Sequence, residues 1–301
     1  MPVKERLATL FILVGPGGVG KNALMTEILK RSDKLKQLAT ATTRAPRTGE
    51  RDGIHHLFVT VSEFRQMIED DELLEYQEVH PGKFYGVPRR VIKEAIQNRQ
   101  DLIADIEFKG AEILQQQFPD NSITIFIAPP SVDALQQRMV DRQDSIQDIQ
   151  DRLNRMSIEM LYAPRCDYII VNDHFDTALA ELNDIIQLER GEIAALTTPL
   201  HQVSYIAHIT FKQGDKILKI TEQPYLPCPI KQGDTPYDAV TRCIANYLKQ
   251  PVNNDQLRYA HPAGLLPVEM MLHQRQYQIT YHFLYELPST FEPLNGLEWS
   301  S

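Results

Sequence analysis

Apolar residues run without interruption from Leu7 to Val14, a pattern that predicts a strand buried on both faces of a parallel sheet. A glycine-rich segment follows, and a helix-forming stretch then runs from Asn22 to Arg31. Further apolar runs predict strands at 101–106, 122–128 and 168–171. Helices are expected near 88–98, 108–117, 131–141, 145–161 and 176–190. This alternation predicts an α/β fold with a mostly parallel sheet and helices on both faces. The order strand, glycine-rich segment, helix at its start makes the sheet one of the P-loop type.

The pattern changes after residues 191–200, which have the character of a connector. Residues 201–222 and 275–287 alternate as strands do, and one helix is expected near 236–249. This is an α+β segment of about a hundred residues, the size of a small domain. We therefore expect two domains, 1–192 and 201–301.

Composition narrows the classes of function. The chain has 301 residues and a net charge of −9, which argues against a nucleic-acid binder because phosphate backbones attract a surplus of cations. No apolar run of about 18 residues occurs, so no membrane span is expected. Three scattered cysteines and nine histidines show no spacing typical of a disulfide framework or a metal cluster. Together these features favour a protein of the reducing cytoplasm.

The segment Gly15–Lys21 has the pattern G-x-x-x-x-G-K between the first strand and the first helix. Backbone N–H groups of such a loop cradle phosphate oxygens, and the lysine reaches the β and γ phosphates. Asn22 stands where Ser or Thr usually ligates Mg²⁺, and its amide oxygen also suits a hard cation. The expected ATP site comprises Gly15, Gly17, Gly18, Val19, Gly20, Lys21, Asn22 and Ala23.

The segment 40–50, TATTRAPRTGE, resembles the T-T-R-x-P-R-x-G-E signature of guanylate kinases. Other matching pieces follow in the family's order over about residues 7–190: DG at 52–53, FV at 58–59, LEY at 74–76, FYG at 84–86, DIE at 105–107, APPS at 128–131 and VND at 171–173. The resemblance implies a kinase that transfers phosphate from ATP to GMP or dGMP in line, with Mg²⁺ as cofactor and small nucleotides as partners.

The resemblance assigns the acceptor's phosphate to Arg44, Arg47, Tyr85 and His56, the last standing where the family has a tyrosine. Guanidinium groups grip phosphate oxygens with two hydrogen bonds.

By the same resemblance, Thr40, Glu75 and Glu107 contact the base. A carboxylate at Glu75 would accept hydrogen bonds from guanine N1–H and the exocyclic amine, a donor pair that adenine lacks.

The resemblance also implies a lid whose arginines, Arg138, Arg142 and Arg152, stabilise charge on the transferring phosphoryl group. Asp105 matches a carboxylate that orients Mg²⁺, so Asn22 and Asp105 are the metal candidates. Asn172 is expected at the adenine.

Departures from the family pattern keep two alternatives open. Val87 replaces a hydroxyl residue that contacts the base, and Asn22 follows the loop lysine. Ribose bisphosphate kinases share such departures but lack the complete T-T-R-x-P-R loop, so another phosphorylated acceptor is the first alternative. A catalytically weak nucleotide-binding or interaction module is the second, although such modules commonly lose Lys21 and the lid arginines.

The second domain carries a faint likeness to the Nudix box at residues 230–250. Cys243, Asn246 and Tyr247 stand where that box has metal-binding glutamates, so we expect a degenerate Nudix-like domain without hydrolysis. Thr235 is expected as a helix N-cap with Pro236 next to it. Nucleotide binding, homodimer formation and partner recruitment remain open as roles.

Overall fold

The computed structural model describes residues 8–47, 49–80, 82–219, 225–249, 251–261, 266–291 and 298–300. The chain divides into two compact units. The first unit comprises Met1–Gly15, Gly20–Ile127 and Asn172–Pro199. The second comprises Pro16–Val19, Ala128–Val171 and Leu200–Ser301.

The core sheet has the strand order β2-β7-β1-β8-β9. Its strands are β1 (Leu10–Val14), β2 (Leu35–Gln37), β7 (Asp101–Asp105), β8 (Ser122–Ala128) and β9 (Tyr168–Val171). β1 pairs in parallel with β7 and β8. Because successive side chains of a strand point to opposite faces and all five of β1 are buried, both faces of this strand are covered. The predicted parallel α/β sheet is confirmed.

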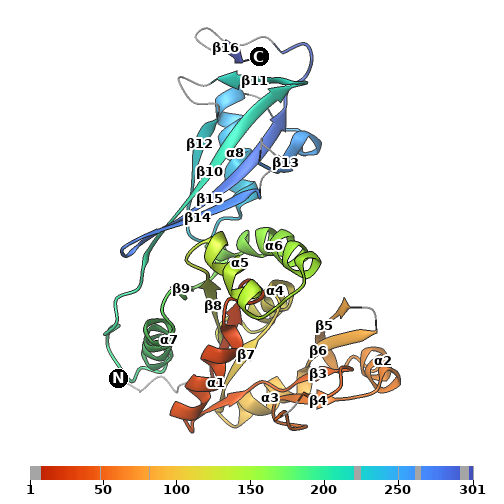
Figure 1. Cartoon of the computed structure of the whole chain (residues 1–301). Coiled ribbons are helices and arrows are strands. Elements are labelled where there is room, and N and C mark those ends of the chain that lie inside the picture. The colour runs from red at the N-terminus through yellow and green to blue at the C-terminus, as the bar shows by residue number, and fades with distance from the viewer. Residues whose placement is uncertain are drawn as a thin grey trace. The chain divides into compact units, whose positions relative to one another are not determined.

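The helices of the first unit are α1 (Lys21–Arg31), α2 (Val61–Glu69), α3 (Arg89–Gln97), α4 (Phe108–Gln117) and α7 (Phe175–Glu189). α1 packs against α7 and β7, while α4 packs against β1 (Figure 1). These helices begin and end within about two residues of the expected positions except α2, which the sequence pattern did not predict. α2 begins with a capping box, in which Thr60 and Glu63 satisfy each other's backbone N–H groups.

A second, four-stranded sheet in this unit has the order β4-β3-β6-β5. It is formed by β3 (Thr40–Thr42), β4 (His56–Phe58), β5 (Leu73–His80) and β6 (Lys83–Pro88). Phe64 of α2 is fully buried with Ala41 and Leu73, so α2 closes the apolar side of this sheet. The sheet aligns Thr40 with His56 and Glu75 with Val87 on neighbouring strands.

The second unit contains helices α5 (Val132–Asp141) and α6 (Ile146–Met160), a short 3₁₀ helix η1 (Ala163–Arg165), and a mixed sheet. Its strands are β10 (Gln202–Gln213), β11 (Lys216–Lys219), β12 (Leu226–Ile230), β13 (Leu257–Tyr259), β14 (Val268–His273), β15 (Gln276–Glu286) and β16 (Glu298–Ser300). The long strands β10 and β15 run parallel from Gln202↔Gln276 to Lys212↔Glu286. Helix α8 (Pro236–Leu248) packs on β10 and β12, and a 3₁₀ turn η2 spans Asn254–Gln256 (Figure 1).

Strand β12 is not among those that the sequence pattern predicts, because it contains Pro227 and Pro229. It pairs with β10. Residues two apart in a strand direct their backbone nitrogens to the same edge, so the nitrogens of both prolines, which carry no hydrogen, can face the edge opposite β10. Two prolines at this spacing are therefore compatible with a strand that pairs on one side.

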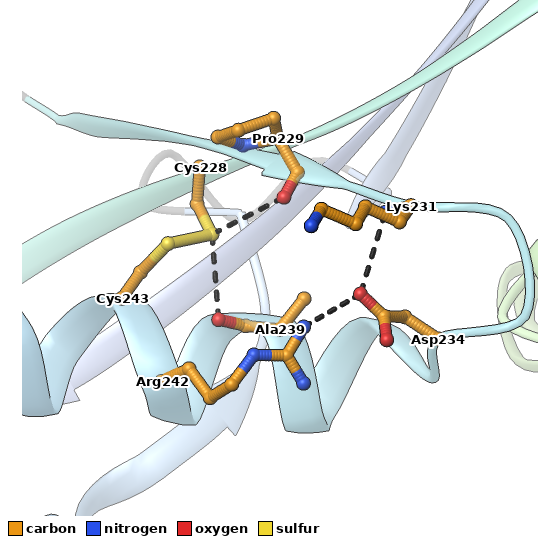
Figure 2. Close-up of a disulfide and its surroundings, with 7 residues drawn as sticks. All are labelled: Cys228, Pro229, Lys231, Asp234, Ala239, Arg242 and Cys243. Atoms are coloured by element: carbon orange, nitrogen blue, oxygen red, sulfur yellow. Dashed lines mark hydrogen bonds and ion pairs between the residues drawn. A yellow bond between two sulfur atoms is a disulfide. The ribbon is translucent and has the colours of Figure 1, made fainter.

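Helix α8 begins as expected, with Thr235 as N-cap accepting a hydrogen bond from the backbone N–H of Asp238 and Pro236 in the first turn. The expectation about cysteines is wrong, however. Cys228 of β12 and Cys243 of α8 form a disulfide (Figure 2). The third cysteine, Cys166, is buried and lies outside this bond. Sequence spacing gave no sign of the pair because the strand and the helix meet only through the fold.

Tyrosine hydroxyls join the mixed sheet to helix α6 and its neighbours. The hydroxyl of Tyr281 donates to the carbonyl of Met160 at 2.8 Å, and that of Tyr259 donates to Ser157 at 3.0 Å. The hydroxyl of Tyr277 donates to the carbonyl of Pro129 at 2.6 Å. Tyr277 and Tyr281 are fully buried, so these contacts explain why residues 128–171 belong to one unit with 200–301.

In the described part of the chain, no helix has the length and apolar character needed to cross a membrane.

Candidate functional site

The glycine loop begins at the end of β1, where only glycine fits. Gly15 has φ +133, and a Cβ there would collide with the carbonyl of Ile127. Gly20 has φ +105 and precedes α1 directly, so it turns the chain into the helix. The first turn of α1 contains no acidic residue, which leaves its positive end favourable for an anion.

Lys21 lies at the junction of the loop and the sheet. Its Nζ donates to the carbonyl of Gly15 at 2.6 Å and lies 3.6 Å from Oδ1 of Asp105. Asp105 ends β7, beside Leu13 of β1. Burial raises the pKa of the Asp105 carboxyl, and the charge of Lys21 partly opposes this. An ammonium group and a carboxylate are thus held together at the carboxyl ends of parallel strands, where such sheets bind ligands.

Two asparagines border the loop in the first unit. The Asn172 amide approaches Gly20 so closely that a Cβ at that glycine would lie 2.6 Å from its Nδ2. Asn172 is buried. Asn22 is exposed in the first turn of α1, so its amide is accessible to a ligand.

The loop residues of the second unit meet two of the expected lid arginines. A Cβ at Gly18 would lie 3.1 Å from Nη2 of Arg142, and one at Gly17 would lie 3.9 Å from Nη1 of Arg152. Asp144 holds Nη2 of Arg142 at 2.9 Å and lies 3.9 Å from Nε of Arg152. Both guanidinium groups therefore lie near the backbone of Gly17 and Gly18.

Arg138 and Arg142 lie four residues apart at the end of α5. Arg138 is in its last turn and Arg142 is its C-cap, after which Gln143 has φ +61.

Arg44 is clamped in the four-stranded sheet. Its Nη1 and Nη2 donate to the two carboxylate oxygens of Glu50 at 2.7 and 2.8 Å, and its Nε donates to the hydroxyl of Tyr85 at 3.0 Å. Arg44 lowers the pKa of Glu50 to about 2. Arg47 is exposed and donates its backbone N–H to the same carboxylate.

His56 lies next to this clamp. Its Nδ1 is 2.8 Å from the hydroxyl oxygen of Thr40, and its Nε2 is 4.0 Å from Oε1 of Glu50. Its ring meets the edge of Tyr85. Burial lowers the pKa of His56, and the positive charge of Arg44 lowers it further, which favours the neutral imidazole. Thr40, Arg44, His56 and Tyr85 therefore form one polar group.

Glu75 of β5 points to the N-terminal end of α4. A Cβ at Gly110 would lie 3.0 Å from its Oε1, so glycine is needed at that position of α4. Burial raises the pKa of Glu75 to about 7, and the negative charge of Glu107 also raises it, while a hydrogen bond with Gln77 lowers it. Val87, opposite Glu75 in the sheet, has an exposed fraction of 0%. The carboxyl group thus lies in an apolar setting suited to a buried hydrogen-bond partner.

Sequence reasoning missed three acidic residues in these arrangements. Glu50 pairs with Arg44, and Asp144 pairs with Arg142. The sequence signal that could have indicated these pairs is the alternation of acidic and basic residues in the segments 44–50 and 142–152. Glu269 lies among histidines of the second unit, where sequence spacing predicted no metal cluster.

A buried parallel strand, a glycine loop with Lys21 and a helix N-terminus define a P-loop nucleotide-binding α/β protein. Residues 7–189 match the family model described as guanylate kinase. The chain is 40% identical over 187 residues to a guanylate kinase of Maricaulis maris, covering 62% of this chain and 85% of that one. It is 41% identical over 192 residues to a guanylate kinase of Desulfitobacterium hafniense, covering 64% and 95%.

The chain belongs to the guanylate kinase family. A crystal structure of guanylate kinase from Anaplasma phagocytophilum aligns with a TM-score of 0.48 and 26% identity, covering 61% of this chain and 86% of that one.

Proposed function

We propose that the chain transfers the terminal phosphate of ATP to GMP or dGMP. The main support for the proposal is the family match over residues 7–189. The matched segment includes the glycine loop and Arg44 with its partners Glu50 and Tyr85. Relatives of 40% identity bear the name guanylate kinase. Phosphoryl transfer needs positioned phosphates and compensating positive charge rather than a covalent intermediate, and these residue types supply both.

The assigned roles follow the chemistry of each group. Main-chain N–H groups from Gly15 to Ala23 cradle the ATP phosphates, and Lys21 neutralises the transferred group. Arg138, Arg142 and Arg152 act as the lid cations. The Asn172 amide receives the adenine.

Arg44, Arg47, Tyr85 and His56 hold the acceptor's phosphate. The clamp between Arg44 and Glu50 supports this role, since a fixed guanidinium loses little entropy on binding. Thr40, Glu75 and Glu107 read the base, with Glu75 accepting the two guanine N–H donors.

Mg²⁺ fits the oxygen donors of Asn22 and Asp105, because it prefers carboxylate and carbonyl ligands and retains several waters. When bound, it would neutralise charge between the β and γ phosphates. Lys21 holds Asp105 in place for this contact.

A coupled assay of ADP release tests the proposal across GMP, dGMP, AMP, CMP and ribose 1,5-bisphosphate. We expect kcat/KM for GMP to exceed that for AMP by at least about 100-fold, because a buried carboxylate is left unpaired by adenine. Absence of turnover with every purine monophosphate would contradict the proposal.

A kinase for another phosphorylated acceptor, such as ribose 1,5-bisphosphate, is the second candidate. Val87 supports it, since this buried valine offers no donor where the family has a hydroxyl. Turnover with the sugar phosphate but not with GMP would select it. Tight ATP binding without turnover, unchanged by Asn22→Ser, would select a catalytically weak binding module instead.

We further propose that residues 1–192 form the kinase domain and 201–301 a second, non-hydrolytic domain. The resemblance to a Nudix box rests on residues whose contacts are structural. Asp234 accepts from Nη2 of Arg242 at 2.6 Å (Figure 2). Thr235 caps α8. Absence of nucleoside monophosphate release from a panel of nucleoside diphosphate derivatives would agree with this; cleavage of their diphosphate bond would contradict it.

Small nucleotides as partners, a cytoplasmic location and a homodimer complete the proposal. The Cys228–Cys243 bond weighs against the location, since disulfides are rare in reducing compartments. Alkylation of thiols in intact cells, followed by counting of modified cysteines, tests the location. Light scattering of the purified chain tests the dimer.

A further inference from the structure

Two histidines and a glutamate of the mixed sheet converge on a small volume. The ligand atoms of His261, Glu269 and His282 all lie within 4.8 Å of one another. Oε1 of Glu269 is 3.3 Å from Nε2 of His282 and 3.8 Å from Nε2 of His261. Ligands bound to one zinc-type ion at about 2.0–2.1 Å in tetrahedral directions are roughly 3.4 Å apart. The spacing between Glu269 and His282 matches this value, and the wider ones require only small side-chain movements.

Backbone pairing fixes the three residues relative to one another. The backbone N–H of His282 donates to the carbonyl of Pro267 at 2.8 Å, and its carbonyl accepts from Ala260 at 3.1 Å. Glu269 pairs with Thr280 on the adjacent strand, so its side chain is a diagonal neighbour of His282. Sites built on paired strands hold their ligands more rigidly than sites on loops.

A second observation at this cluster points to a ligand-binding role. His282 is 7% exposed, and its Nε2 is buried without a hydrogen-bond partner despite the nearby carboxylate. A buried polar atom without a partner is destabilising unless something else binds it. The cluster therefore contains a buried ring nitrogen that forms no hydrogen bond within the described protein.

Ring contacts hold the imidazole of His282 in place. His208 packs edge-on against His282 and stacks on Tyr225. His261 meets the His282 ring edge-on from another segment, with ring centroids 4.4 Å apart.

We propose that His261, Glu269 and His282 bind one divalent transition-metal ion of the zinc type. Two imidazoles and one carboxylate suit such an ion, whereas Mg²⁺ and Ca²⁺ prefer oxygen ligands alone. Glu269 is 59% exposed, which gives the ion a route from solvent. The fourth position would be taken by water, as in zinc sites with three protein ligands. None of the three residues has a role in the proposed kinase chemistry.

Cobalt titration of the full-length, tag-free protein tests this site. Chelator-treated protein is titrated with Co²⁺ in millimolar Mg²⁺, which occupies the oxygen sites, and visible absorption is followed. We expect one equivalent of Co²⁺ with the bands of a nitrogen–oxygen site, displaced by Zn²⁺. Metal analysis after dialysis against Zn²⁺ gives an independent count.

Glu269→Gln and His261→Gln should weaken Co²⁺ binding at least about tenfold, since even indirect supporting partners of metal ligands contribute 10- to 100-fold. His273→Gln is the matched control, because His273 is an exposed histidine on the same strand as Glu269. Near-UV circular dichroism verifies that each variant is folded. Failure of the wild type to bind one equivalent would overturn the proposal, as would binding that persists in both ligand variants.

Discussion

The guanidinium group of Arg44 and the carboxylate of Glu50 form two parallel hydrogen bonds of 2.7 and 2.8 Å. This pair turns Arg44 toward Tyr85, whose hydroxyl accepts from Nε. An arginine in a surface loop would otherwise sample many rotamers, and fixing it costs free energy that binding must supply. Glu50 therefore positions Arg44, and the first prediction concerns this relationship.

Glu50→Gln should raise KM for GMP by about tenfold while changing kcat less, because the neutral amide releases Arg44 from its charged partner. Steady-state kinetics measure both constants, and Glu69→Gln, an exposed glutamate of α2, is the control. The stabilisation from this pair is present above pH 4.5 and is lost as pH falls toward 2, because the folded-state pKa of Glu50 is lowered. An unchanged KM would show that Arg44 is oriented without Glu50.

Lys21→Met should lower kcat by about 10²- to 10³-fold or more, because no other group replaces its charge at the transferred phosphate. Lys30→Met is the matched control, since Lys30 is exposed on the same helix and pairs with Glu27. Single-turnover measurements separate the chemical step from binding. Equal kcat in the two variants would contradict the assigned role.

Glu75→Gln should remove a pH dependence of folding stability. The folded-state pKa of Glu75, about 7, exceeds its ordinary value of 4.5. The protonated carboxyl group therefore stabilises the folded state fully below pH 4.5, and this stabilisation is lost as pH rises through 7. Relative to wild type, the free energy of unfolding of the variant should rise by roughly 1–2 kcal/mol between pH 4.5 and 8, allowing for solvent screening. Urea unfolding at each pH measures this, with the exposed Glu72→Gln as control. A difference that stays constant with pH would show that Glu75 is not buried as described.

Tyr281→Phe should destabilise the second unit by about 1 kcal/mol or somewhat more, because the carbonyl of Met160 loses its buried donor. The control is Tyr76→Phe, whose side chain is 50% exposed. Hydrogen exchange of helix α6 should quicken in the first variant only. Exchange that is the same in both variants would mean that the tyrosine does not secure this helix.

Thiol counting tests the disulfide. Unfolded protein without reductant should react with one equivalent of Ellman's reagent, from Cys166, and with three after reduction. Cys243→Ser should lower the free energy of unfolding by about 3 kcal/mol for a loop of this length. Cys166→Ser is the comparison for a cysteine outside the bond. Three reactive thiols before reduction would rule the bond out in the purified protein.

Much of the fold followed from local pattern. Continuous apolar runs and the G-x-x-x-x-G-K segment were sufficient for the parallel sheet and α1, because buried strands and phosphate loops demand particular residue types at each position. Thr235 and Pro236 predicted the start of α8 for the same reason. Strand β12 escaped prediction, since proline is compatible with a strand only when its pairing partner is known.

The sequence by itself determined the α/β class, the glycine loop and the family, because these depend on residues close together in the chain or on a long ordered match. Only the tertiary structure decided that Glu50 pairs with Arg44, that Cys228 meets Cys243, and that His261, Glu269 and His282 converge. Such contacts depend on strand pairing and on helix packing between distant segments. No local periodicity encodes those distances, since the same residues would be solvated if the sheet had formed in another register.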